Sequence, residues 1–209
     1  MIKPEPKFRR VQPQTRRGLL VDATLRCLAA HGHAGVSARR IAAEAGVSPG
    51  LINHHYAGIE ELIAAAYETA SVDILDNILE HVATAAGPRA RLTAFFEASF
   101  APRVFDPKLI NIWVVFWSML PHAPALKEIQ KRTFSDYRAS LERELAALAG
   151  EEGFVDFDAR RAALGLSSLL DGLWLDGGLN PGGFQPAEGV TVCEDWVDGL
   201  VARERARRA

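Results

Sequence analysis

Residues 37–56 read SARRIAAEAGVSPGLINHHY, and this stretch decides the fold. Ser37 is a suitable N-cap for the short helix ARRIAAEA, and Gly46 breaks that helix with the backbone freedom that a tight turn needs. Ser48 then caps a second short helix, with Pro49 in its first turn. Apolar positions recur where the two helices must meet: Ile41, Ala42, Val47 and Ile52. The spacing indicates a helix-turn-helix, whose second helix enters the DNA major groove, although helical hairpins in plain bundles share it.

The charge distribution favours the DNA-binding interpretation. Residues 1–56 hold nine basic and three acidic side chains, a net charge of +6, whereas the rest of the chain carries −8. Such asymmetry is typical of a chain in which one end contacts a polyanion, although a solvated basic face is the alternative.

Almost every other segment has apolar residues at helical spacing, and no useful length alternates with period two. We therefore expect an all-α fold of eight to ten helices: an N-terminal three-helix helix-turn-helix domain and a C-terminal helical bundle. The expected domains are 1–58, with an N-terminal arm, and 59–209. A long helix should close at Gly87-Pro88, another should run from the Asp158 cap to Leu175, 177–189 should be a loop, and a last helix should cover 190–206.

The run from Arg17 to Leu62 resembles the DNA-binding domain of TetR-family repressors. The matching residues include Ile41-Ala42, Ala45-Gly46-Val47-Ser48 and Glu60-Glu61-Leu62. The resemblance implies a homodimer that binds double-stranded DNA at a near-palindromic operator, with a C-terminal domain for a small-molecule inducer. Two positions depart from the family: Asn53 replaces an aromatic residue, and Ile59 replaces a lysine that contacts phosphate. An N-terminal arm with Arg9, Arg10, Arg16 and Arg17 is expected to compensate.

The segments INIWVVFWSML (110–120) and LLDGLWLDGGL (169–179) resemble the C-terminal domain of the BetI-type branch of that family. Members of this branch repress glycine-betaine synthesis genes and respond to choline. The resemblance implies a ligand-responsive repressor of betaine or choline metabolism genes. The alternative is a TetR-like regulator of unrelated genes with an apolar or other small ligand.

Several polar residues of the motif are candidates for DNA contact. Asn53 can pair with adenine, and Arg39 resembles a family position that reaches a base, where guanine is the natural partner. His54, His55, Ser48 and the nearby amides can contact phosphates. Each could also be a merely exposed polar residue. The full candidate set is Arg16, Arg17, Ser37, Arg39, Ser48, Pro49, Gly50, Leu51, Asn53, His54 and His55.

A ligand site is expected between the helices at 107–120 and 159–175. Asp171 stands among leucines and Trp174, so its carboxylate should be buried and in need of a partner, which an Arg, the backbone or a bound cation could supply. Aromatic faces attract quaternary ammonium ions, although aromatic stripes are more often plain core. The candidate ligand residues are Trp113, Phe116, Trp117, Phe134, Tyr137, Asp171 and Trp174.

A stripe of small residues on the same helix, together with the last helix, predicts a two-fold four-helix dimer interface; the alternative is packing within one chain. The residues concerned are Ala162, Gly165, Leu169, Gly172, Val192, Trp196, Val197 and Leu200.

Other function classes find little support in the sequence. The longest apolar run is 112–117, far short of a membrane span, and the charged start MIKPEPKFRR is no secretory signal. We expect no cofactor and no metal site, and a cytoplasmic, nucleoid-associated protein. An all-α enzyme using Asp171 as a lone base and a nonspecific architectural DNA binder are the rival functions.

Overall fold

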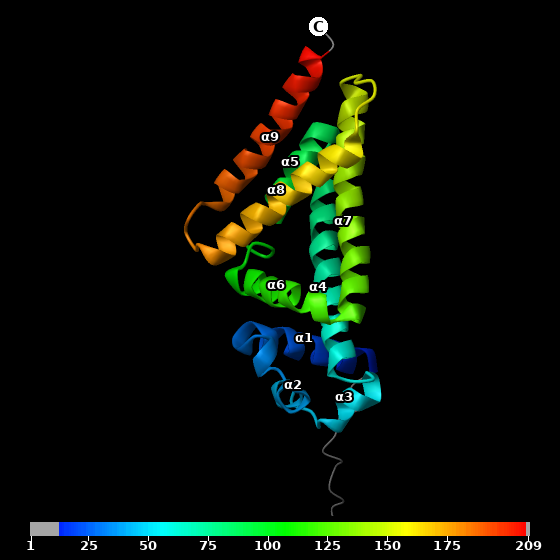
Figure 1. Cartoon of the computed structure of the whole chain (residues 1–209), viewed down its shortest axis with the longest axis vertical. Coiled ribbons are helices and arrows are strands. Elements are labelled where there is room, and N and C mark those ends of the chain that lie inside the picture. Colours follow the sequence, from blue (N-terminus) through cyan, green and yellow to red (C-terminus); the bar gives the residue numbers. More distant parts are fainter. Residues whose placement is uncertain (1–12, 208–209) are drawn as a thin grey trace, which may run out of the picture. The chain divides into compact units, whose positions relative to one another are not determined.

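A computed structural model describes residues 13–207, with side chains from Arg16 onward. In this part of the chain it contains nine α-helices, two short 3₁₀ turns and no strand, which confirms the all-α prediction (Figure 1). None of the helices within 13–207 has the length and apolar character required to cross a membrane. The chain divides into two compact units, 1–66 and 67–209. The expected domain boundary after residue 58 stays a prediction.

The first unit is built around the helix-turn-helix. It contains α1 (Pro13–His31), α2 (Ala38–Glu44), α3 (Gly50–His55) and the beginning of α4 (Ile59–Val82). Arg26 on α1 forms an ion pair with Glu44 at the end of α2, with Nε 2.6 Å from the carboxylate. Leu20 of α1, Ile41 of α2 and Ile52 of α3 are completely buried.

The second unit packs the remaining helices around one apolar core. After the rest of α4 come α5 (Pro88–Ser99), α6 (Pro107–Met119), α7 (Pro124–Glu151), α8 (Ala159–Leu179) and α9 (Pro186–Ala206). The helix α7 lies against α5 and α8, and α9 lies against the same two helices (Figure 1). Phe95, Phe96 and Leu166 are fully buried at the centre of this core.

Two expected helix ends are wrong. The helix α4 ends at Val82, because the next residues form tighter turns, in which Ala85 N–H donates to the Val82 carbonyl. The helix α8 continues to Leu179, so only 180–185 separates it from α9. Gly177 and Gly178 permit close packing here instead of a turn: a Cβ at Gly178 would lie 2.1 Å from Ile110 Cγ2.

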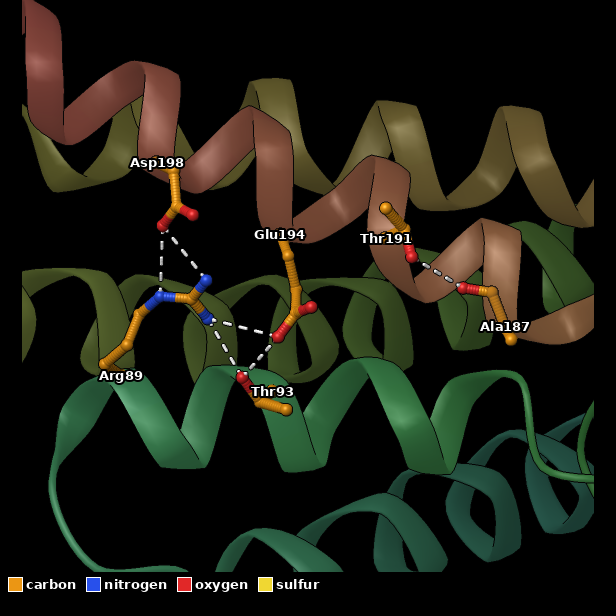
Figure 2. Close-up of polar contacts among 6 residues, drawn as sticks. All are labelled: Arg89, Thr93, Ala187, Thr191, Glu194 and Asp198. Carbon is orange, nitrogen blue, oxygen red and sulfur yellow. Dashed lines mark hydrogen bonds and ion pairs between the residues drawn. The ribbon is translucent and has the colours of Figure 1, made fainter.

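A polar network fastens α9 to α5 (Figure 2). Arg89 donates from Nε and Nη2 to one oxygen of Asp198, at 3.2 and 3.0 Å, and from Nη1 to Thr93 Oγ1 at 2.9 Å. The Thr93 hydroxyl in turn donates to Glu194 at 2.8 Å. Because one guanidinium joins two carboxylates and a hydroxyl, the register of α9 on α5 is specified by directional bonds as well as by apolar contact.

The small-residue stripe packs mainly within the chain. A Cβ at Gly165 would lie 3.0 Å from the indole of Trp196, and Ala162 and Val197 are buried in the core. Ala162, Gly165 and Val197 therefore help to join α8 to α9 within the chain, and the two-fold interface expected on these two helices stays a prediction. Val192, which belongs to the predicted dimer set, faces solvent, and so do Leu164 and Leu179 of α8.

Candidate DNA-binding unit and ligand cavity

The turn between α2 and α3 has the geometry that the sequence predicts. Ser37 Oγ accepts a hydrogen bond from the Arg40 N–H at 3.2 Å, which confirms the cap. Gly46 has φ +67°, in the left-handed region where a side chain would be strained. The Val47 N–H then donates to the Ala42 carbonyl at 2.9 Å and closes the turn.

The expected cap at Ser48 is wrong. The helix α3 begins at Gly50, its N-cap position is Pro49, and no side-chain bond caps it. Pro49 already has helical dihedrals. The Ser48 main-chain carbonyl therefore accepts the first hydrogen bond at this end of the helix, from the Leu51 N–H at 3.0 Å, and the Ser48 hydroxyl does not. The Ser48 hydroxyl is therefore left exposed for another partner.

Most candidate DNA contacts lie at the surface. Arg16, Leu51 and His55 are half-buried. The exposed candidates are Arg17, Ser37, Arg39, Ser48, Pro49, Gly50, Asn53 and His54. Exposure makes these side chains available to a duplex, and their individual roles stay predictions.

The arginines at the start of the chain differ from an extended arm. Arg16 and Arg17 lie inside α1, and the Arg17 guanidinium carbon stands 4.7 Å from the centre of the Tyr56 ring. Arg9 and Arg10 lie outside the described residues. Arg17 therefore joins α1 to the end of α3. If Arg17 also contacts a DNA phosphate, the same guanidinium must contact both the phosphate and the Tyr56 ring.

His55 is a poorer phosphate contact than its neighbour. Burial lowers its pKa, and the positive charges of His54, Arg17 and Arg16 lower it further. Its Nε2 is buried with no hydrogen-bond partner among residues 13–207. A lowered pKa favours the neutral imidazole of His55, which attracts phosphate less than a cation does. His54 is exposed and is therefore the more accessible candidate of the pair.

The second unit contains a cavity of about 310 Å³. Within residues 13–207 no group of three or more His, Cys, Asp or Glu side chains is placed to hold a metal ion. The cavity is lined mainly by apolar side chains from α4, α6, α7 and α8. Of the predicted ligand residues it brings together six: Trp113, Trp117, Phe134, Tyr137, Asp171 and Trp174.

Phe116 is the predicted ligand residue that does not line the cavity. Its ring is fully buried, with its centre 5.0 Å from that of Tyr67 and 5.8 Å from that of Trp113. It supports the wall from the core side. The i, i+3, i+4 spacing of Trp113, Phe116 and Trp117 places them on one helix face, but that face is wider than the cavity it borders.

Asp171 is the charged residue of the cavity wall. It is mostly buried, and burial raises its pKa from 3.8 to about 6, although the positive charge of Arg138 opposes that rise. No cation within residues 13–207 comes close enough to form an ion pair with it. A mostly buried carboxylate without such a pair is costly, unless it is protonated or meets a cation.

Two family profiles match this chain. The profile described as "BetI-type transcriptional repressor, C-terminal" covers residues 88–202, and that described as "Bacterial regulatory proteins, tetR family" covers 20–66. A regulator from Burkholderia thailandensis, named HTH-type transcriptional regulator BetI, is 31% identical over 90% of this chain and 95% of its own length. The chain belongs to the BetI-type branch of the TetR family. It is a DNA-binding transcriptional repressor with a ligand-binding domain, and regulators of this family act as dimers.

Solved structures agree with the fold of this TetR-family repressor. A protein described as a transcriptional regulator, from Pseudomonas aeruginosa PAO1, has 48% sequence identity and a TM-score of 0.89, covering 94% of this chain and 96% of its own. A regulator from Saccharomonospora viridis, crystallised in complex with choline, has 20% identity and a TM-score of 0.77, covering 90% and 97%. The second likeness shows the fold alone.

Sequence reasoning missed the side of the cavity that α4 supplies. Tyr67, Ser71 and Leu75 line it, together with Gln130 and Thr133 of α7. Ala70 and Ile78 of the same helix are buried. The signal that could have found this side is the pair Tyr67 and Ser71, two hydroxyl-bearing side chains one turn apart on α4.

Proposed function

We propose that this repressor controls genes of choline or betaine metabolism and is relieved by a small organic cation, with choline as the first candidate. One observation carries the proposal: Asp171 stands without an ion pair, among residues 13–207, in a cavity walled by aromatic rings. With a pKa of about 6, this carboxylate is mainly ionised at neutral pH. A cation in the cavity would compensate its charge.

The aromatic walls suit a quaternary ammonium ion. Trp113, Trp117 and Trp174 line the cavity, and Phe134 and Tyr137 stack with ring centres 6.0 Å apart. A desolvated cation–π contact contributes about 0.5–2 kcal/mol, so two or three rings and one carboxylate are sufficient for micromolar affinity. The names of the BetI relatives and the choline bound by the S. viridis protein support the same ligand class.

On the DNA side, we propose that two copies bind a near-palindromic operator through α3, with Asn53 and Arg39 reaching bases and the other exposed candidates contacting the backbone. The DNA-binding domain is proposed to end near residue 58. Leu164 and Leu179 on α8 and Val192 on α9 are solvent-facing, and we assign them to the dimer face. The protein acts in the cytoplasm, where its operator lies.

The helix α4 is the proposed connection between ligand and DNA. It is continuous from Ile59 to Val82: residues 59–66 belong to the first unit, and Tyr67, Ser71 and Leu75 line the cavity. A ligand changes DNA affinity only if it binds two states unequally. A cation that favours one placement of α4 would change the spacing of the two recognition helices, which must meet half-sites about one helical turn apart.

An apolar ligand is the second candidate, because the cavity wall is largely apolar apart from the Asp171 carboxylate. An apolar ligand would bind equally well to wild-type protein and to Asp171→Asn, whereas a cation would not. The substitution therefore separates the two candidates.

The function is tested by selecting bound sites from random duplex DNA, with and without choline. We expect a near-palindromic consensus that is recovered without choline and lost in its presence. Recovery of random sequences would favour an architectural role, and a consensus unaffected by choline would exclude choline as the inducer.

A further inference from the structure

Arg138 touches the cavity wall without lining the cavity. It lies on α7, half-buried, with its guanidinium carbon 4.7 Å from the centre of the Phe134 ring. Its Nε donates a long hydrogen bond, 3.4 Å, to Ser167 Oγ on α8, one turn before Asp171. Phe134 and Asp171 both line the cavity. One guanidinium thus contacts one wall residue and is anchored beside the other.

The surroundings of Asp171 contain little other charge. The phenols of Tyr67 on α4 and Tyr137 on α7 interact electrostatically with it, and burial raises the pKa of both, so they are neutral at physiological pH. The thiol of Cys193 on α9 acts on Tyr137, and burial raises its pKa to about 12. The cavity residues of α6 are Trp113 and Trp117. Among the described residues, Arg138 is the cation that acts on Asp171.

We propose that Arg138 is a positioning residue of the ligand site: it holds the Phe134 ring in the wall and keeps the Asp171 carboxylate charged, without forming the ion pair that would occupy it. This inference rests on the proposed function, because it concerns a cavity that receives a cation. Within residues 13–207 no ion pair joins Arg138 to Asp171 or to another carboxylate, although ion pairs are present elsewhere on α7, such as that of Arg91 with Glu144. The guanidinium is stacked on Phe134 instead.

Removal of the Arg138 charge has a consequence that a packing defect does not share. An opposite charge close to a carboxylate lowers its pKa by about 1–3, so without Arg138 the Asp171 carboxyl keeps its proton to higher pH. A cation binds the ionised form, and the pH at which affinity reaches half of its alkaline plateau must therefore rise. Loss of packing alone would lower the plateau and leave that midpoint in place.

The test compares Arg138→Gln with Arg143→Gln, which removes the same charge from an exposed position on the same helix. Choline affinity is measured by tryptophan fluorescence from pH 5 to 9. The midpoint should rise by about one pH unit in R138Q and remain at the wild-type value in R143Q. In Arg138→Lys, which keeps the charge but not the planar stacking, the midpoint should also equal the wild-type value. An unmoved midpoint in R138Q overturns the inference. If R138Q does not fold, Arg138→Met, which keeps an unbranched stem, takes its place.

A second measurement requires no ligand. The Asp171 carboxyl is titrated by carbon-13 NMR in the full-length, ligand-free protein, and its midpoint should be higher in R138Q than in wild type. Equal midpoints overturn the role of Arg138. A raised midpoint in a protein that binds no choline would support the electrostatic role of Arg138 and reject the proposed inducer, so the two failures are distinguishable.

Discussion

The indole N–H of Trp174 donates a hydrogen bond to the main-chain carbonyl of Ser99, 3.1 Å away. Ser99 is the last residue of α5, so this carbonyl is one of those that a helix end leaves without an intrahelical partner. The bond satisfies both groups and fixes the orientation of the indole, one face of which borders the cavity. An aromatic wall of the proposed ligand site is thereby set by a backbone group of another helix.

Trp174→Phe should remove the hydrogen bond to the Ser99 carbonyl while it keeps an aromatic ring in the cavity wall. It leaves the Ser99 carbonyl unpaired, and we expect a loss of about 1–2 kcal/mol in the free energy of unfolding, measured by urea denaturation. Choline affinity should fall by less than ten-fold, because a weaker π face remains. Trp174→Ala is the companion variant and should lose both stability and choline binding. Equal choline affinity in wild type and W174A would remove Trp174 from the site.

Asp171→Asn should stabilise the ligand-free protein at neutral and alkaline pH. The native-state pKa of about 6 exceeds 3.8, so the native state binds the proton more readily, and stability is lost as pH rises from about 4 through 6. The difference corresponds to at most roughly 3 kcal/mol, at about 1.4 kcal/mol per pKa unit. Urea unfolding at pH 8 should show D171N as the more stable protein, and at pH 4 the gap should close. A gap independent of pH would contradict the burial of an ionised Asp171.

Substitutions in the helix-turn-helix should divide into two classes. Asn53→Ala and Arg39→Ala should each cost about 1–3 kcal/mol of operator binding and little of random-sequence binding. Arg16→Ala should weaken both alike and reduce the salt dependence, because a phosphate contact carries no sequence information. Fluorescence anisotropy with both duplexes at two salt concentrations measures this. Unchanged operator binding by N53A would show that the assigned register of α3 is wrong.

Gly178→Ala should destabilise the second unit by about 1–3 kcal/mol, because its Cβ would lie 2.1 Å from Ile110 Cγ2 in a closely packed contact. Gly150→Ala is the matched control on α7, where a new Cβ meets no atom within 4 Å. There, the alanine should be neutral or stabilising by up to about 1 kcal/mol. Thermal unfolding of both variants measures their stability. Equal destabilisation by the two alanines would show that the close α6–α8 contact at Gly178 does not restrict the side chain there.

The sequence predicts well those features that depend on local spacing. The Ser37 cap, the Gly46 turn and the Asp158 cap all follow from rules that act within one turn, and all are observed. Prediction from the sequence fails where one residue type can serve two structural roles. Glycines 177 and 178 suggest a loop by composition, but their role is close contact with Phe105 and Ile110, residues distant in sequence.

The ligand cavity shows the same division. Helical spacing brings Asp171 and Trp174 to one face of α8, and both line the cavity. The contribution of α4 and the position of Arg138 depend on how helices cross, which no periodicity within one helix reports.

The central claim is that Asp171 receives an organic cation in this cavity. Calorimetric titration of choline into wild-type protein and D171N at pH 7.5 tests it most directly, because D171N keeps the shape of the side chain and removes its charge. We predict micromolar binding by wild type, because two or three ring contacts and one carboxylate are enough for that affinity, and no binding by D171N. Absence of binding to wild type at millimolar choline, or equal binding by both proteins, would contradict it.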